Sequence, residues 1–256
     1  MPVLDLFRLD GRVALVTGGN RGLGRAIAQG FAEAGASVAV TSRDSARAQA
    51  AAADLSQQTR RPCLGLPLDV RRHEQVDAAV ARTTDELGAL DILVNNAGLN
   101  IRESILDLKD ESWVEVIETN LGGAMRCSRA AARHMKEKGW GRIIHIASML
   151  SFVGIAQRVS YASSKAGLLG MTRAMALDLA PYGITVNALC PGPFKTEINR
   201  PILSDPKYLK EFLRQIPLGR MGDPAELKGA AVFLASEAGA YITGTALLVD
   251  GGWTTQ

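Results

Sequence analysis

Three side chains that could handle a proton lie close together in the middle of the sequence. Tyr161 and Lys165 are four residues apart in a helical stretch, so both project from one helix face. Ser148 precedes Tyr161 at the end of an apolar run. A free tyrosine has a pKa near about 10 and is a poor base at neutral pH, but a neighbouring ammonium group favours the phenolate. These residue types predict acid–base chemistry in which Tyr161 moves a proton, Lys165 lowers the pKa of Tyr161 and Ser148 polarises a substrate oxygen.

The sequence predicts an α/β scaffold to hold these residues, because short apolar runs alternate with longer helical stretches. The predicted strands cover residues 13–17, 38–41, 64–68, 91–94, 142–147, 184–189 and 246–249. Helices are predicted over residues 22–34, 44–58 and 73–87, and before the fifth and sixth strands. Strands that are apolar on both sides are typical of a sheet covered by helices on both faces. We therefore expect a Rossmann-type, doubly wound sheet of seven mainly parallel strands.

A single domain is expected over residues 1–256, because the sequence has no internal repeat and no Pro- or Ser-rich linker. One long irregular region runs from about residue 191 to 224 and is rich in Pro, Lys and Arg. Its length exceeds that of ordinary loops, which favours a functional flap with short helices over an inert surface excursion.

Composition excludes several classes of function. A formal net charge of +3 on 256 residues leaves no basic footprint for nucleic acid or an anionic membrane. The three cysteines and three histidines are scattered, which predicts neither a disulfide framework nor a metal site and favours a reducing cytoplasm. The N-terminus lacks a long apolar run, so no signal peptide is expected. The longest uncharged stretch, residues 143–157, is too short and polar for a membrane span.

A glycine-rich turn lies between the first predicted strand and the first predicted helix. It contains Gly18, Gly22 and Gly24 in the spacing Gly-x-x-x-Gly-x-Gly. Glycines at this place let the backbone turn tightly and approach a pyrophosphate, and the helix N-terminus supplies N–H donors and a positive dipole end. The turn therefore predicts dinucleotide binding.

This glycine spacing resembles the short-chain dehydrogenase/reductase family, and further motifs extend the resemblance over nearly the whole chain. In chain order they are Asn95-Asn96-Ala97-Gly98, Asn120, Ser148, Tyr161 with Lys165, Pro191-Gly192 and Asp250-Gly251-Gly252. The resemblance implies hydride transfer between a nicotinamide and an alcohol or carbonyl. It assigns catalytic roles to Asn120, Ser148, Tyr161 and Lys165, with Lys165 also holding the nicotinamide ribose and Asn120 organising a water relay.

The resemblance also implies which residues bind the cofactor. They are Gly18, Asn20, Arg21, Gly22, Leu23, Ser42, Arg43, Asp69, Val70, Asn96, Ala97, Gly98, Tyr161, Lys165, Pro191, Gly192 and Thr196. In the family, residues matching Asp69 and Val70 flank the adenine. Those matching 96–98 line its ribose, and those matching Pro191, Gly192 and Thr196 contact the nicotinamide side.

The end of the second strand favours NADP(H) over NAD(H). An NAD enzyme usually carries an acidic residue there, which hydrogen-bonds the ribose 2′-OH. The expected position is Ser42, which is not acidic, and Arg43 follows it. Arg21 in the glycine turn and Arg43 are expected to converge on a 2′-phosphate. Asp44 is the contrary observation, and we interpret it as a helix N-cap.

The substrate is less clearly indicated. Residues 146–152 and 250–253 resemble the sugar-acid branch of the family, which includes gluconate 5-dehydrogenases and 2-dehydro-3-deoxy-gluconate dehydrogenases. Five residues could form a rim for a carboxylate or could be ordinary solvated surface: Arg102, Gln157, Arg158, Lys195 and Arg200.

Three other functions compete with that of a sugar-acid enzyme. A 3-oxoacyl thioester reductase shares the catalytic set and a stretch like residues 240–244. A non-catalytic, cofactor-bound sensor would not need an activated tyrosine. A hydrolase dyad of His145 with Ser148 is disfavoured, because their spacing in a strand points them in opposite directions.

Family members are commonly tetramers. The resemblance therefore implies a homotetramer that packs helices around residues 120–135 and 160–179 and pairs the last strands of neighbouring subunits.

Overall fold

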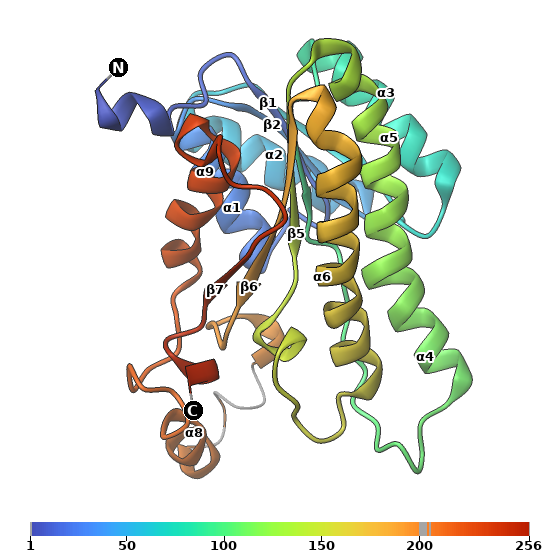
Figure 1. The fold of residues 1–256 in the computed structure, drawn as a ribbon, viewed down its shortest axis with the longest axis vertical. Coiled ribbons are helices and arrows are strands. Elements are labelled where there is room, and N and C mark those ends of the chain that lie inside the picture. The colour runs from blue at the N-terminus through green and yellow to red at the C-terminus, as the bar shows by residue number, and fades with distance from the viewer. Residues whose placement is uncertain (1, 200–203, 205, 256) are drawn as a thin grey trace.

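A seven-stranded parallel sheet forms the centre of the structure, a computed structural model that describes residues 2–199, 204 and 206–255 (Figure 1). The strands are β1 (Val13–Val16), β2 (Ser37–Ser42), β3 (Cys63–Pro67), β4 (Ile92–Asn95), β5 (Gly141–Ile146), β6 (Ile184–Pro191) and β7 (Ala246–Val249). Their order is β3-β2-β1-β4-β5-β6-β7, and every pairing is parallel. The predicted fold class is confirmed. The strand order reverses between β1 and β4, and ligands bind outside the carboxyl ends of strands at such a point.

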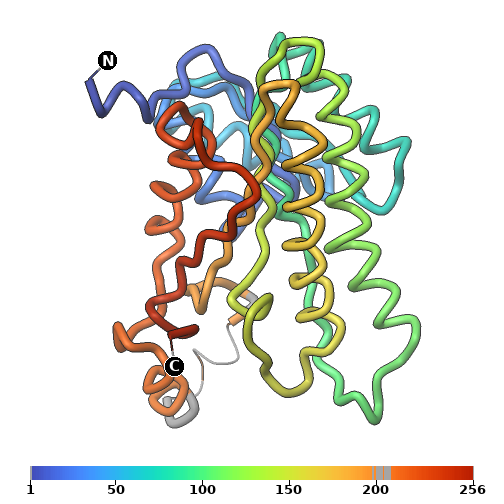
Figure 2. Tube along the Cα trace, in the orientation of Figure 1, coloured from blue at the N-terminus to red at the C-terminus, as the bar shows by residue number. Residues whose placement is uncertain are grey.

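Helices cover both faces of this sheet. They are α1 (Gly22–Glu33), α2 (Ser45–Thr59), α3 (His73–Leu87), α4 (Asp110–Ile117), α5 (Gly123–Lys138), α6 (Val159–Leu179), α8 (Pro206–Leu213) and α9 (Lys228–Ala235). Figures 1 and 2 show α1 and α9 on one side of the sheet and α3, α5 and α6 on the other.

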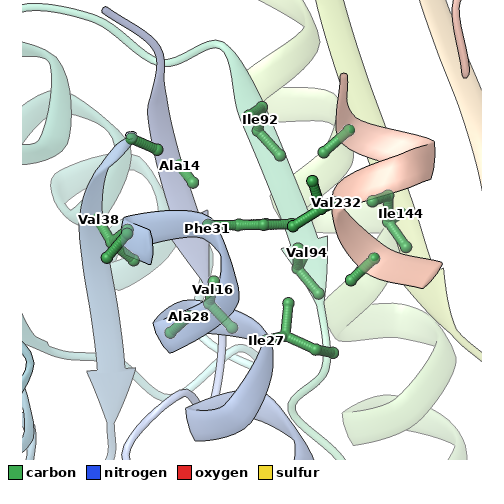
Figure 3. Packing of buried hydrophobic residues seen from close by; sticks show 14 of the residues in the cluster. Ala14, Val16, Ile27, Ala28, Phe31, Val38, Ile92, Val94, Ile144 and Val232 are labelled. Atoms are coloured by element: carbon green, nitrogen blue, oxygen red, sulfur yellow. The ribbon is translucent and has the colours of Figure 1, made fainter. Parts of the chain in front are cut away.

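Two hydrophobic clusters explain why the strands are apolar on both sides. On one face, Val16 and Val94 pack with Phe31 of α1 and Val232 of α9 (Figure 3). On the other face, alternate strand residues such as Leu15 pack against α3 and α5. Burial of each large apolar side chain stabilises the fold by roughly 1.5–3 kcal/mol. The sheet can therefore hold the ends of its strands, where the polar motifs lie, in fixed relative positions.

The segment around Asn120 departs from an ordinary helix. A π-helical turn, Glu118–Gly122, joins α4 to α5. Such turns insert one extra residue per turn and occur often at functional sites. Among residues 2–199, 204 and 206–255, every helix is too short or too polar to cross a bilayer.

Short helices occur in the region predicted as a flap. The turn Glu197–Asn199 and helix α8 lie within it. Its base is closed by a parallel bridge between Phe194 and Gly222, and the Gly222 N–H donates to the Pro193 carbonyl over 2.9 Å. Arg200, named in the predicted basic rim, lies outside the described residues.

Candidate active site

The glycine-rich turn is held against the end of β4 by side-chain hydrogen bonds. The Thr17 Oγ1 accepts from the backbone N–H groups of Asn96 and Ala97, each over 3.0 Å. The Asn96 Nδ2 donates to the carbonyl oxygens of Thr17 at 2.9 Å and Gly18 at 3.1 Å. Asn96 therefore clamps the turn to the sheet at the strand-order reversal.

Two glycines of the turn have structural reasons to be glycine. Gly18 has a φ of +61°, and a Cβ there would lie 3.1 Å from the Ala97 Cα. A Cβ on Gly24 would overlap the Asn96 amide and lie 2.8 Å from the Gly18 carbonyl oxygen. Side chains at these two positions would therefore prevent the turn and the start of α1 from lying this close to the end of β4.

A cavity of about 630 Å³ opens where the turn, the ends of β4, β5 and β6, and the flap meet. Every cofactor residue predicted from the sequence lines it, as do three of the four predicted catalytic residues, Ser148, Tyr161 and Lys165. The glycine turn lies at one end of the cavity, and Ser148, Tyr161 and Lys165 lie at the other. This arrangement fits a bound dinucleotide with its nicotinamide near Tyr161.

Lys165 is the most constrained of these three catalytic candidates. It is 4% exposed, and its Nζ donates to the Ile146 carbonyl oxygen over 2.6 Å. The Nζ lies 5.6 Å from the centroid of the Tyr161 ring. Burial lowers the pKa of Lys165 to about 8, because desolvation disfavours its charged form. The lysine is thus fixed between the end of β5 and the tyrosine.

The pKa of Tyr161 is shifted in the direction opposite to the sequence-based expectation. Burial raises it, and neither the hydrogen bond with Ser148 nor the charge of Arg158 cancels that effect. We expected Lys165 to lower this pKa. In this arrangement the ammonium of Lys165 is engaged by the Ile146 carbonyl, so loss of solvent dominates at the phenol.

Asn120 lies behind the cavity and does not line it. Its amide bonds the backbone of Leu99 in both directions, accepting over 2.9 Å and donating over 3.0 Å. Its Nδ2 also donates to the Ser164 Oγ, whose hydroxyl donates to the Tyr161 carbonyl oxygen. Asn120 therefore joins the loop after β4 to the helix that carries Tyr161. The predicted water relay stays a prediction.

At the far end of the cavity, the two arginines that are expected to converge on a 2′-phosphate both line the wall, and one of them has an acidic partner. Arg21 pairs with Glu197 of the flap, with 2.5 Å between Nη1 and Oε2. The sequence could not show this pair, because its members are 176 residues apart. Arg43 lines the cavity, and within the described part of the chain it has no hydrogen bond or ion pair. Asp44 caps α2 as predicted, accepting from the Arg47 N–H over 3.2 Å.

Two lining arginines were not singled out by the sequence. Arg71 bonds Asp69, with 2.6 Å between Nη2 and Oδ2, and this hydrogen bond lowers the pKa of Asp69. Arg47 forms an ion pair with Asp44. Arg71 lies two residues after Asp69, and Arg47 lies three residues after Asp44. This closeness in sequence to residues already predicted was the only signal that could have pointed to them.

Only part of the predicted basic rim lines the cavity. Arg102 and Arg158 line the cavity, whereas Gln157 and Lys195 do not. His145 is fully buried away from the cavity, with its Nδ1 3.1 Å from the Asn95 Nδ2. Burial lowers its pKa to about 3. This arrangement agrees with the argument against a dyad of His145 with Ser148.

Comparison with known proteins extends over almost the whole chain. The profile of the enoyl-(acyl carrier protein) reductase family matches residues 18–254. The 3-oxoacyl-(acyl-carrier-protein) reductase of Vibrio harveyi is 42% identical over 244 residues, which cover 95% of this chain and 98% of the relative. The 2-dehydro-3-deoxy-D-gluconate 5-dehydrogenase of Escherichia coli (strain K12) is 40% identical over 258 residues, covering 99% and 100% of the two chains.

A solved structure gives the same result. The gluconate 5-dehydrogenase from Burkholderia cenocepacia J2315, in complex with NADP and tartrate, superposes with a TM-score of 0.95 at 40% identity and covers 99% of both chains. Relatives of two different activities are thus similar to this chain to nearly the same degree. The motifs, the fold and these matches agree, and the chain belongs to the short-chain dehydrogenase/reductase family of oxidoreductases.

Proposed function

We propose that the protein is an NADP(H)-dependent oxidoreductase that interconverts a secondary alcohol and a ketone on a sugar acid or polyol, such as gluconate and 5-ketogluconate. The observation that carries the proposal is the placement of Ser148, Tyr161 and Lys165 around one cavity that also receives the glycine turn. Nicotinamide would supply the hydride at its C4.

The chain's own residues would manage the substrate oxygen and its proton. The Ser148 hydroxyl orients and polarises that oxygen. In the reductive direction the Tyr161 phenol donates its proton to the oxygen, and in the oxidative direction the phenolate takes it back. Lys165, held by the Ile146 carbonyl, keeps a positive charge beside the tyrosine. Asn120 does not reach the substrate, and its role is to hold the loop at Leu99 to α6.

Preference for NADP(H) is supported by the residues at the end of β2. Ser42 stands where an NAD enzyme usually carries its acid, and Arg43, which follows it, lines the cavity. A guanidinium recognises a phosphate dianion well, because it offers several donors in one plane. Arg21 is engaged with Glu197, so the proposal rests on Arg43.

A sugar-acid substrate is supported by charge. Seven lining residues are cationic and three are acidic. The cavity therefore carries more positive charge than binding of one phosphate group requires, and it can attract a second anionic group. The similar Burkholderia enzyme was crystallised with tartrate, a hydroxy-dicarboxylate. The second candidate is reduction of a 3-oxoacyl thioester, which the 42% identity to the Vibrio reductase favours.

The assembly and the compartment are also proposals. A homotetramer is supported by apolar side chains exposed on α6 and β7. A cytoplasmic site is supported by the three free cysteines, two of them buried.

A substrate and cofactor panel tests the function. Nicotinamide absorbance is followed with NADP⁺ or NAD⁺ against gluconate and related sugar acids, and with NADPH or NADH against keto-sugar acids and a 3-oxoacyl thioester. We expect turnover of a sugar acid with NADP(H), reduced at least about 1,000-fold in Tyr161→Phe. Turnover of the thioester alone would move the enzyme to the second candidate. A preference for NAD(H) would contradict the role of Arg43, and cofactor binding without any turnover would support the sensor.

A further inference from the structure

Arg158 has an unusual backbone setting at the entrance to α6. It is the N-cap of that helix, three residues before Tyr161, and it is half-buried in the cavity wall. The preceding residue, Gln157, has a φ of +61°, a left-handed conformation that is uncommon for a residue with a side chain. Such strain persists where surrounding structure imposes it, often at ligand sites.

A backbone bridge supplies that surrounding structure. Arg158 pairs in parallel with Glu103 of the loop after β4. Glu103 is tied in turn to the start of α4, because its carboxylate accepts from the Ser112 hydroxyl at 3.1 Å and the Lys109 N–H at 3.3 Å. The backbone of Arg158 is therefore fixed between two segments, and Arg102, which precedes its bridge partner Glu103, also lines the cavity.

The carboxylates in the cavity wall leave the Tyr161 end positively charged. Each has an arginine partner: Asp44 with Arg47 at 3.3 Å, Asp69 with Arg71 at 2.6 Å and Glu197 with Arg21 at 2.5 Å. Asp44 and Asp69 lie toward the β2 end, away from Tyr161. Around Tyr161 the lining charges are Lys165, Arg158 and Arg102. A substrate whose alcohol carbon sits at Tyr161 would thus meet cations, and every carboxylate among the described lining residues already has an arginine partner.

We propose that Arg158 is a specificity-determining residue whose guanidinium binds the carboxylate of the substrate while the substrate oxygen lies at Ser148 and Tyr161. The proposal rests on the sugar-acid function proposed above and names the group that would select for it. Arg158 is better suited than Arg102, because it is half-buried and its backbone is held by the bridge, whereas Arg102 is exposed. A partly desolvated guanidinium binds a carboxylate more strongly than an exposed one.

Substituting Arg158→Gln tests this with a matched pair of substrates. D-gluconate and D-glucitol share the carbon chain and differ at C1, where gluconate carries the carboxylate. We expect the KM and the calorimetric Kd for gluconate, measured on the NADP⁺-loaded enzyme, to rise about 10- to 100-fold. The same constants for glucitol should change by less than about twofold. Arg173→Gln, the same substitution at an exposed position of α6, should leave both substrates unaffected.

A pH profile separates a direct electrostatic role from a structural one. The charge of Arg158 acts to lower the pKa of Tyr161, so its removal should move the rise in glucitol oxidation to higher pH. Lys165 and Arg102, which also line the cavity near Tyr161, and Glu197 farther along the cavity wall are unchanged in the variant. Arg158→Lys keeps the charge and should restore the profile and part of the gluconate affinity. A variant that had merely loosened α6 would not be rescued in this way.

The outcomes distinguish the two proposals. An equal loss for gluconate and glucitol, or an unchanged gluconate Kd, overturns the role of Arg158. If the wild type binds gluconate without oxidising it, the proposed function fails. The Kd for gluconate of Arg158→Gln relative to that of the wild type would still test whether Arg158 binds the carboxylate. If gluconate does not bind, tartrate replaces it as the carboxylate probe in the same titration. Failure of the wild type to bind either carboxylate overturns the proposal.

Discussion

Two opposing effects act on Tyr161. Burial disfavours the negative phenolate and raises the pKa, while the hydrogen bond with Ser148 and the charge of Arg158 act to lower it. Burial prevails, so the phenol is the dominant form at neutral pH. A phenol is the form that donates a proton to a carbonyl, whereas alcohol oxidation needs the phenolate. At neutral pH Tyr161 is therefore in the protonation state that can donate to a carbonyl oxygen.

This balance predicts opposite pH profiles for the two directions. With cofactor saturating, kcat/KM for alcohol oxidation should rise by about tenfold per pH unit until Tyr161 ionises. The kcat/KM for ketone reduction should stay flat and then fall above the same pKa. Because the pKa of Tyr161 is raised above its ordinary value near about 10, initial rates between about pH 6 and about pH 10 should show the rise in oxidation and the flat part of the reduction profile. Tyr161→Phe serves as the control, since its residual activity should lack the ionisation. Oxidation that slows as the pH rises would contradict the assignment of Tyr161 as the proton carrier.

At the scale of elements, the contact between α1 and the end of β4 positions the glycine turn. Gly24 lies against the Asn96 amide, and that amide bonds the carbonyl oxygens of Thr17 and Gly18. Attachment of the turn to the end of β4 thus depends on the missing side chain at Gly24.

Gly24→Ala should therefore weaken cofactor binding. The new Cβ would displace the Asn96 amide, break its two hydrogen bonds and move the turn, so we expect the Kd of NADPH to rise at least about tenfold. The free energy of unfolding should fall by about 1–3 kcal/mol. Fluorescence titration and chemical denaturation measure the two effects.

Gly229→Ala in α9 is the matched control, because a Cβ there meets nothing within 4 Å. It should leave the Kd unchanged and add up to about 1 kcal/mol of stability, since alanine is the better helix former. An unchanged Kd in Gly24→Ala would show that the turn tolerates the shift.

Features that depend on local sequence could be predicted, whereas features that depend on tertiary packing could not. The glycine turn and the seven strands follow from local composition and hydrophobic pattern, and the predicted strand bounds differ from the observed ones by at most two residues. The pair of Arg21 with Glu197 and the raised pKa of Tyr161 depend on tertiary packing, which no local pattern carries. The π-helical turn at Asn120 lies between two stretches that each have ordinary helical periodicity, so no local signal marks it.

The whole molecule presents apolar surface on the elements that the family resemblance assigns to subunit contacts. Leu177 on α6 is 79% exposed, and Met125 on α5 is 39% exposed. Strand β7 is at the edge of the sheet, and Leu248 on it is also exposed. An open edge strand and apolar helix faces are typical of surfaces that pair with another chain. A closed symmetric assembly would bury the same patches on every subunit.

The homotetramer can be tested by placing a charge on one of these faces. Light scattering of the wild type should give about four times the mass of the 27.2-kDa chain. Leu177→Asp should shift the protein to smaller species, because burying an unpaired carboxylate in an apolar interface costs several kcal/mol. Leu106→Asp is the control: Leu106 is 90% exposed, in a loop outside the proposed contacts, and its variant should keep the wild-type mass. A wild type that is monomeric at micromolar concentration, or an unchanged mass for Leu177→Asp, would remove α6 from the interface. Because Leu177 lies far along α6 from Tyr161, residual activity of the smaller species would show that each subunit holds a complete site.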